Sequence, residues 1–159
     1  MAAETKSRRA GAAIRVCRLE DTEGVTRILG ESAEAAEWSA GSLQEALSWA
    51  GVVVLVSEGE GSVVTGFIIG RQVGDEAEIL NLAVTPARRR KGEGGALLGA
   101  VMEEFAKRQI SRVFLEVRES NQTGIEFYSK HGFTKTGRRP GYYRAPDEAA
   151  MVMEKKLTV

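Results

Sequence analysis

The chain is poor in the residues that bind metals and form disulfides: its 159 residues include a single cysteine, Cys17, and a single histidine, His131. One cysteine cannot form a disulfide within the chain or supply a cluster of several thiolates. Zinc sites are built mainly from cysteine and histidine side chains, so we expect no metal cofactor. Cys17 lies in a predicted strand, where we expect it to pack rather than to act as a nucleophile.

Long apolar runs and an excess of charge of either sign are also lacking. No run approaches the roughly 18 residues that a membrane-spanning helix needs, and the first residues lack the apolar segment of a signal peptide. We therefore expect no membrane partner and a cytoplasmic location. Lys plus Arg and Asp plus Glu each total 22, for a net charge of zero. This balance disfavours a protein whose whole surface binds nucleic acid.

The pattern of apolar residues indicates one domain. Residues 1–13 are small, polar and basic without periodicity, which predicts a flexible N-terminal tail, and residues 14–159 form a single domain. The expected elements are a strand near 14–19, a helix after Asp21-Thr22, helix within 31–51, strands at 52–56, 63–70 and 77–84, a helix at 92–109, a strand at 113–117, a helix at 121–131, and strands from 133 and at 151–157. The helix at 92–109 makes a parallel crossover in an otherwise antiparallel order, so we predict an α+β fold with a mixed sheet.

One stretch organises this pattern. An apolar strand from Asn81 leads into four consecutive cations, residues 88–91, and then into glycines that open a helix. Because Gly92, Gly94 and Gly95 stand where a capping side chain is usual, the first N–H groups of the helix are left bare. Bare N–H groups, the helix dipole and cations together predict an anion site, for which a pyrophosphate is the first candidate. The alternative is a solvated surface patch.

Comparison with known phosphate-binding loops narrows the class of nucleotide that this stretch could bind. The Walker pattern and the spacing of three glycines in the Rossmann loop are both missing. The remaining pattern, Arg89-x-x-Gly92-x-Gly94, resembles the acetyl-CoA loop of the GNAT superfamily of N-acetyltransferases. Two further segments, Leu115-Glu-Val-Arg-Glu-Ser-Asn121 and Ile125-Glu-Phe-Tyr-Ser-Lys-His-Gly-Phe133, are similar to RimI-type enzymes, which acetylate the N-terminal alanine of a ribosomal protein.

This resemblance implies the GNAT acyl-CoA N-acyltransferase fold, a central mixed, mostly antiparallel sheet with about four helices, and acetyl-CoA as the acetyl donor. It implies a donor site made of Leu82, Ala83, Val84, Arg89, Arg90, Lys91, Gly92, Glu93, Gly94, Gly95, Asn121 and Tyr128. It implies acceptor contacts from Trp38, Tyr142 and Tyr143. Relatives often have an apolar residue in place of Glu93, so an acidic side chain there is expected to point to solvent or to weaken phosphate binding.

The catalytic residues are also assigned through the resemblance. Glu116 corresponds to the proposed general base and Tyr128 to the proposed acid that protonates the leaving thiolate. The alternative for Glu116 is a salt bridge on a solvent face, with Arg118 two residues away as its partner. Tyr128 could instead be a core aromatic residue, and Asn121 could be a helix cap rather than a contact to the pantetheine arm. His131 is expected to be structural.

These residues predict an N-acetyltransferase that transfers acetyl directly to a protein N-terminal α-amine, with a ribosomal protein as one candidate partner. A rival keeps the fold and changes the acceptor to a small-molecule amine. Two other classes remain open: a non-catalytic acyl-CoA-binding module, and an RNA-binding protein that uses residues 88–91 and would bind with strong salt dependence. We favour no direct nucleic-acid partner. The sequence gives no indication of the oligomeric state.

Overall fold

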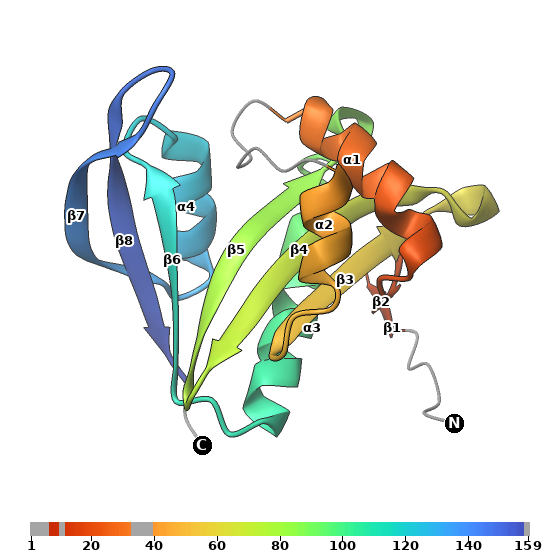
Figure 1. Cartoon of the computed structure of the whole chain (residues 1–159), viewed down its shortest axis with the longest axis horizontal. Helices are drawn as coiled ribbons and strands as arrows, with labels where there is room; N and C mark the ends of the chain where they lie inside the picture. Colours follow the sequence, from red (N-terminus) through yellow and green to blue (C-terminus); the bar gives the residue numbers. More distant parts are fainter. Residues whose placement is uncertain (1–6, 10–11, 33–39, 158–159) are drawn as a thin grey trace.

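The computed structural model describes residues 7–9, 12–32 and 40–157 of the chain. Within them an eight-stranded sheet has the spatial order β1-β2-β3-β4-β5-β6-β8-β7 (Figure 1). The strands are β1 (Ser7–Arg9), β2 (Ala12–Val16), β3 (Val52–Glu58), β4 (Val64–Val73), β5 (Glu76–Val84), β6 (Arg112–Arg118), β7 (Thr134–Tyr143) and β8 (Glu148–Lys156). The helices are α1 (Thr22–Gly30), α2 (Ala40–Ala46), α3 (Glu93–Lys107) and α4 (Gln122–Lys130).

The sheet is mixed, as predicted. β5 and β6 pair in parallel, with α3 as the crossover between them, and the other neighbouring strands pair antiparallel. Helices α1 and α2 cover one face of the sheet, and α3 and α4 lie on the other (Figure 1). The α+β prediction is confirmed.

Each face of the sheet carries its own core because side chains alternate along a strand. On the α3 face, Ala77 and Ile79 of β5 pack with Leu97 and Phe105 of α3. Phe105 is fully buried, and a Cβ on Gly70 of β4 would lie only 2.5 Å from its ring. A residue without a side chain at that position therefore lets α3 lie close to the sheet. A second core joins α1 and α2 to the opposite faces of β3 and β4.

The sheet opens between β5 and β6. The two strands pair only from Glu76–Ile79 to Arg112–Leu115, although β5 continues to Val84 and β6 to Arg118. Ile69 of β4 pairs with Asn81 and Gly70 pairs with Ile79, so Leu80 is an extra residue that forms a β-bulge. Beyond the bulge β5 and β6 diverge, as Figure 1 shows. This divergence leaves main-chain edges of both strands facing each other without a strand between them in the described chain.

One feature of the N-terminal half differs from expectation. The prediction of a tail is wrong for Ser7–Arg9, which forms β1 and pairs with β2, and β2 itself begins at Ala12, two residues before the predicted first strand. Main-chain pairing across a short hairpin does not require apolar alternation, so the composition gave no sign of it. Within the Ala-rich stretch 31–51, α2 spans Ala40–Ala46, and residues 33–39 lie outside the described part. No described helix is both long and apolar enough to cross a membrane.

Candidate active site

The N-terminus of α3 has the geometry of an anion site. Gly92 has a φ of +86°, a left-handed conformation that glycine adopts at low cost, and α3 begins at the next residue without a side-chain cap. The carbonyl of Gly92 accepts the N–H of Ala96 at 3.0 Å, which is the first hydrogen bond of the helix. The N–H groups of Glu93, Gly94 and Gly95 precede it and have no partner within the helix. The positive end of α3 is thus open, as the sequence predicted.

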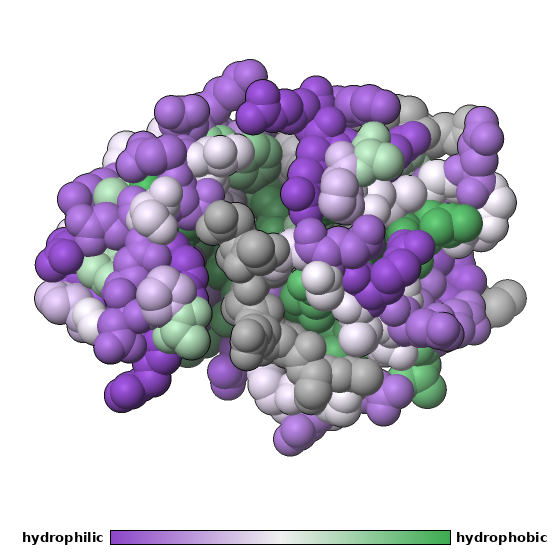
Figure 2. Space-filling model, turned by 90° about the horizontal axis from the view of Figure 1, so that it is seen from above, coloured by the Kyte–Doolittle hydropathy of each residue, from purple (hydrophilic) through white to green (hydrophobic). Residues whose placement is uncertain are grey.

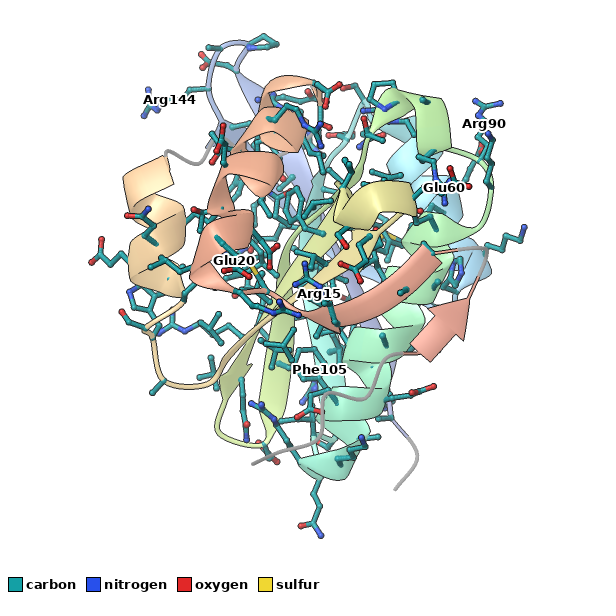
Figure 3. The ribbon with its side chains drawn as sticks, turned by 90° about the vertical axis from the view of Figure 1, so that its right-hand side faces the viewer. Arg15, Glu20, Glu60, Arg90, Phe105 and Arg144 are labelled. Atoms are coloured by element: carbon teal, nitrogen blue, oxygen red, sulfur yellow. The ribbon has the colours of Figure 1, made fainter. Side chains whose placement is uncertain are left out.

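The four loop cations divide into two pairs. Arg88 donates to Glu93 Oε1 from Nε at 3.2 Å and from Nη2 at 3.0 Å. Arg89 donates from Nε to the carbonyl of Val84 at 2.9 Å and from Nη2 to Ser32 Oγ at 3.1 Å, so it ties the loop to the end of α1. Arg90 and Lys91 are exposed, with no side-chain ion pair in the described chain; Figure 3 shows Arg90 extending from the loop. Two cations therefore shape the loop, and two remain accessible to an anion.

Glu93 is not where the sequence led us to expect it. Its side chain is only 1% exposed, and Oε2 has no hydrogen-bond partner among the described residues. The expectation that it points to solvent is wrong, because the first turn of α3 directs this side chain inward, where Arg88 pairs with it. Its main-chain N–H is the part of Glu93 that remains available to an anion.

Along β5, alternate residues turn their main chain toward the opening. The N–H of Thr85 donates to the carbonyl of Thr65 in β4 at 2.8 Å, so the antiparallel pattern directs Ala83 toward β4 and Leu82 and Val84 toward the opening. The N–H of Leu82 donates to Oδ1 of Asn81 at 3.0 Å. Of the three residues predicted to meet the pantetheine arm, Leu82 and Val84 are therefore oriented for it, and Asn81 holds one of the N–H groups.

Glu116 lies in the middle of β6, beside the opening. Its side chain is 9% exposed, Oε1 lies 3.3 Å from Nε of Arg139, and Oε2 has no hydrogen-bond partner among the described residues. The alternative partner suggested by the sequence is wrong: Arg118 pairs with Glu148 at 3.4 Å and lies 4.4 Å from the ring centroid of Tyr143. Glu116 thus holds an acceptor atom that is buried and unused.

Two more groups, Glu78 and Tyr142, join Glu116 and Arg139, and the sequence analysis missed Glu78 and Arg139. Glu78 of β5 is opposite Phe114 of β6, which puts it on the same face of the sheet as Glu116. Burial and then the charge of Glu116 raise the pKa of Glu78, while Arg139 and Arg71 lower it. A side-chain hydrogen bond to Glu116, burial and the charge of Glu116 raise the pKa of Tyr142 to about 12. We call Glu78, Glu116, Arg139 and Tyr142 the carboxylate cluster.

The missed members of the carboxylate cluster had only weak sequence signals. Glu78 alternates with buried residues of β5, a pattern that fits any solvent-facing strand position. Arg139 lies in an exposed stretch of β7. It reaches Glu116 of β6 across β8, and this strand order is not visible in the sequence.

Helix α4 supplies Tyr128 and begins at Asn121. Oδ1 of Asn121 accepts the N–H of Gly124 at 2.8 Å, so its role as a cap is confirmed, and its contact to a pantetheine arm stays a prediction. Tyr128 is half-buried and makes edge contacts with Phe127 and Phe133 at 5.1 and 5.7 Å between ring centroids. Burial, and then the neighbouring Tyr143, raise the pKa of Tyr128, so its hydroxyl stays protonated at neutral pH.

The end of α4 also supports the loop. Nδ1 of His131 donates to the carbonyl of Phe127 at 2.8 Å, and a Cβ on Gly95 would lie 3.0 Å from its Nε2. The single histidine therefore packs against the first turn of α3, which explains why position 95 favours glycine.

The two predicted acceptor residues that belong to the described part of the chain, Tyr142 and Tyr143, lie at the rim of the opening. Tyr142 is 49% exposed, and its ring meets that of Tyr143 edge-on at 5.0 Å between centroids. Trp38 lies outside the described residues. Figure 2 looks down on this end of the molecule and shows hydrophilic residues around a hollow with apolar residues at its base. Among the described residues, no group of three or more acidic, histidine or cysteine side chains is placed to hold a metal ion.

A glycine-led helix facing a split between two parallel strands defines a class of protein. Residues 21–133 match the acetyltransferase (GNAT) family, and the chain belongs to that family. Over 89 residues the chain is 40% identical to the [Ribosomal protein bS18]-alanine N-acetyltransferase of Escherichia coli K12, a match that covers 55% of this chain and 60% of the relative. The chain thus spans about 60% of the length of this curated relative in the match.

Two solved structures are similar over nearly the whole fold. The ribosomal-protein-S18-alanine N-acetyltransferase from Escherichia coli has a TM-score of 0.84 at 29% identity, covering 93% of this chain and 95% of that chain. Ard1 from Thermoplasma volcanium has a TM-score of 0.85 at 32% identity, covering 94% of this chain and 99% of that one. The predicted fold and family are confirmed.

Proposed function

We propose that this protein is an acetyl-CoA-dependent N-acetyltransferase that acts directly on the α-amine of a protein N-terminus. The observation that carries the proposal is the buried, unpartnered Oε2 of Glu116 at the open edge of β6. Membership of the acetyltransferase family supports the reaction. The names of the relatives from Escherichia coli, which refer to the alanine of a ribosomal protein, support the class of acceptor.

The residues present fit acetyl-CoA. The open N-terminus of α3 offers N–H groups to a pyrophosphate, and Arg90 and Lys91 add accessible positive charge. Main-chain groups of Leu82 and Val84 face the opening, where an amide-containing arm can bind as an added strand does. When bound, acetyl-CoA supplies the thioester carbonyl carbon that the amine attacks.

The chain supplies the proton transfers. Oε2 of Glu116 accepts a proton from the ammonium of the acceptor, directly or through water. Tyr128 keeps its hydroxyl proton at neutral pH and donates it to the departing sulfur. The N–H of Leu82 points into the opening. Once this N–H leaves Oδ1 of Asn81, it donates to the oxygen of the thioester carbonyl and stabilises the negative charge that develops there.

A peptide acceptor fits the rim of the site. Tyr142 and Tyr143 are adjacent and offer aromatic surface beside Glu116, and Tyr142 is about half exposed. A second candidate acceptor, a small-molecule amine, is favoured by the pair of carboxylates Glu78 and Glu116, which suit a cation. The proposal therefore turns on which acceptor is acetylated.

The test is acetyl transfer to defined acceptors. Purified protein is mixed with acetyl-CoA and a peptide that matches the N-terminus of ribosomal protein bS18, and free CoA is followed with a thiol reagent. The same peptide with its α-amine blocked is the control, and spermidine and free amino acids form a parallel panel. Peptide-dependent CoA release that needs the free α-amine supports the proposal. Release with small amines alone contradicts it and moves the assignment to the second candidate.

Cys17 bears on this assay because the reagent reacts with thiolates. Burial, and then the nearby charge of Asp21, raise the pKa of Cys17 to about 12. The side chain is 8% exposed. We therefore expect the native enzyme to give a negligible background at pH 8, and the full signal of one thiol to appear after denaturation.

A further inference from the structure

Arg139 has an exposed side chain that pairs with a buried one, that of Glu116. Its Nε lies 3.3 Å from Oε1 of Glu116, and its side chain is 59% exposed whereas that of Glu116 is 9% exposed. Its guanidinium carbon also lies 5.9 Å from the ring centroid of Tyr142. The guanidinium can therefore leave Glu116 for solvent, or for the face of Tyr142, without opening the core.

The charges of the carboxylate cluster suit one further cation. Glu78 and Glu116 together carry two negative charges when ionised. Arg139 carries one positive charge, and Arg71, which lies opposite Glu78 in the neighbouring strand β4, carries another. Arg139 acts on both carboxylates, since it pairs with Glu116 and lowers the pKa of Glu78. With Arg139 in place these four charges balance; once Arg139 turns to solvent, one net negative charge remains, together with the free acceptor atom Oε2 of Glu116. This arrangement matches a single ammonium group that donates to one carboxylate oxygen.

We infer that Arg139 is a resident cation that occupies part of the acceptor-amine site, and that it selects acceptors with one ammonium over polyamines. The α-ammonium of a peptide takes the place of the guanidinium beside Glu116, and Arg139 stays within reach of Glu78. A polyamine brings a second ammonium that finds no free carboxylate. The inference rests on the proposed function to the extent that it takes the acceptor to be an amine.

The neighbouring arginine provides a matched control. Arg138 precedes Arg139 in β7, is 51% exposed and pairs with Glu119 at 2.9 Å rather than with the carboxylate cluster. Both arginines thus form one ion pair from an exposed strand position, and only Arg139 reaches Glu116.

The experiment compares full-length wild type with the variants Arg139→Ala, Arg138→Ala and the double variant Arg139→Ala, Glu78→Gln. Binding of spermidine is measured by isothermal titration calorimetry in the absence of acetyl-CoA. We expect Arg139→Ala to bind spermidine about tenfold more tightly than wild type, or about 1.4 kcal/mol. Arg138→Ala should match wild type, and Glu78→Gln should return the double variant to the wild-type affinity.

Kinetics give a second measurement. Because a peptide no longer has to displace the guanidinium, Arg139→Ala should lower the KM for the peptide by about threefold. A residue with a purely structural role would raise KM and lower the melting temperature instead. Arg139→Gln, which keeps a polar side chain of similar length, serves as the second variant if Arg139→Ala melts at a lower temperature.

The outcomes separate the two proposals. Spermidine binding by Arg139→Ala that is no tighter than that by Arg138→Ala overturns the resident cation, even if the peptide is acetylated. A tenfold gain that Glu78→Gln does not reverse also overturns it, because the freed carboxylate is then not the cause. Tighter spermidine binding as expected, with no variant acetylating the peptide, supports the resident cation and contradicts the peptide acceptor.

Discussion

Replacing Glu116 with glutamine removes the proposed base while it keeps the size and shape of the side chain. General-base catalysis contributes about 10²- to 10⁴-fold to a rate, so we expect kcat to fall by about that factor. The ion pair with Arg139 is also lost, but the arginine side chain is 59% exposed, so the effect on the free energy of unfolding should stay within about 1 kcal/mol. Affinity for CoA should not change, because the predicted phosphate contacts lie on the α3 loop.

Tyr142 reports independently on the same substitution. Its pKa is raised to about 12, with the hydrogen bond to Glu116 as the largest cause. In Glu116→Gln the negative charge is gone, so the pKa of Tyr142 should fall toward the ordinary tyrosine value of about 10. Absorbance of the phenolate followed against pH measures the shift, and Tyr142→Phe identifies which of the three tyrosines causes it.

Two results would refute the reasoning about Glu116. If Glu116→Gln keeps kcat within about threefold of wild type across the pH range, the carboxylate is not the base, and an already neutral amine must be the nucleophile. If the pKa of Tyr142 does not move, burial rather than Glu116 sets it, and the geometry of the carboxylate cluster is wrong. Calorimetric titration with CoA separates either result from a loss of the donor site.

Three further predictions concern α4 and the loop. Tyr128→Phe should lower kcat by about tenfold or more with little change in the KM for acetyl-CoA, as measured by steady-state kinetics. Gly95→Ala should lower the free energy of unfolding by about 1–3 kcal/mol, and His131→Ala should restore part of it, because the added methyl would meet the imidazole at 3.0 Å. In denaturant titrations Arg88→Ala should destabilise more than Glu93→Leu, since only Arg88→Ala leaves a buried carboxylate without its cation; the reverse order would contradict the pairing.

The parts of the site that depend on neighbours in the sequence could be predicted from it. Gly92 follows a strand and precedes an apolar helix, and this local pattern alone indicates an open helix N-terminus. Asn121 stands one residue before α4 and caps it. In each case the relevant partner lies within a few residues, so spacing along the chain is a sufficient guide.

Contacts that depend on strand order could not be predicted in this way. Spacing by two residues suggested Arg118 as the partner of Glu116, but Arg139 reaches it from β7 across β8. Arg89 stays a predicted phosphate ligand, and its hydrogen bond to Ser32, from the end of α1, had no sign in the sequence. Asp21 stands before α1, yet its side chain does not cap the helix and pairs with Arg15 at 2.7 Å. The partner of a charged side chain is the one that the fold brings near it, and a single sequence carries little information about which residue that is.

Glu93 and Glu116 show that position, rather than burial, distinguishes the proposed base from a structural carboxylate. Each has one oxygen bound by an arginine and one oxygen without a partner among the described residues. The arginine of Glu93 is 31% exposed and lies within the same loop, beneath the first turn of α3, so this pair braces the loop. The arginine of Glu116 is 59% exposed and comes from a strand at the sheet edge, while Glu116 itself borders the split between β5 and β6. The proposed exchange of an incoming amine with Arg139 there needs no element to unfold, whereas the same exchange at Glu93 would require α3 to move.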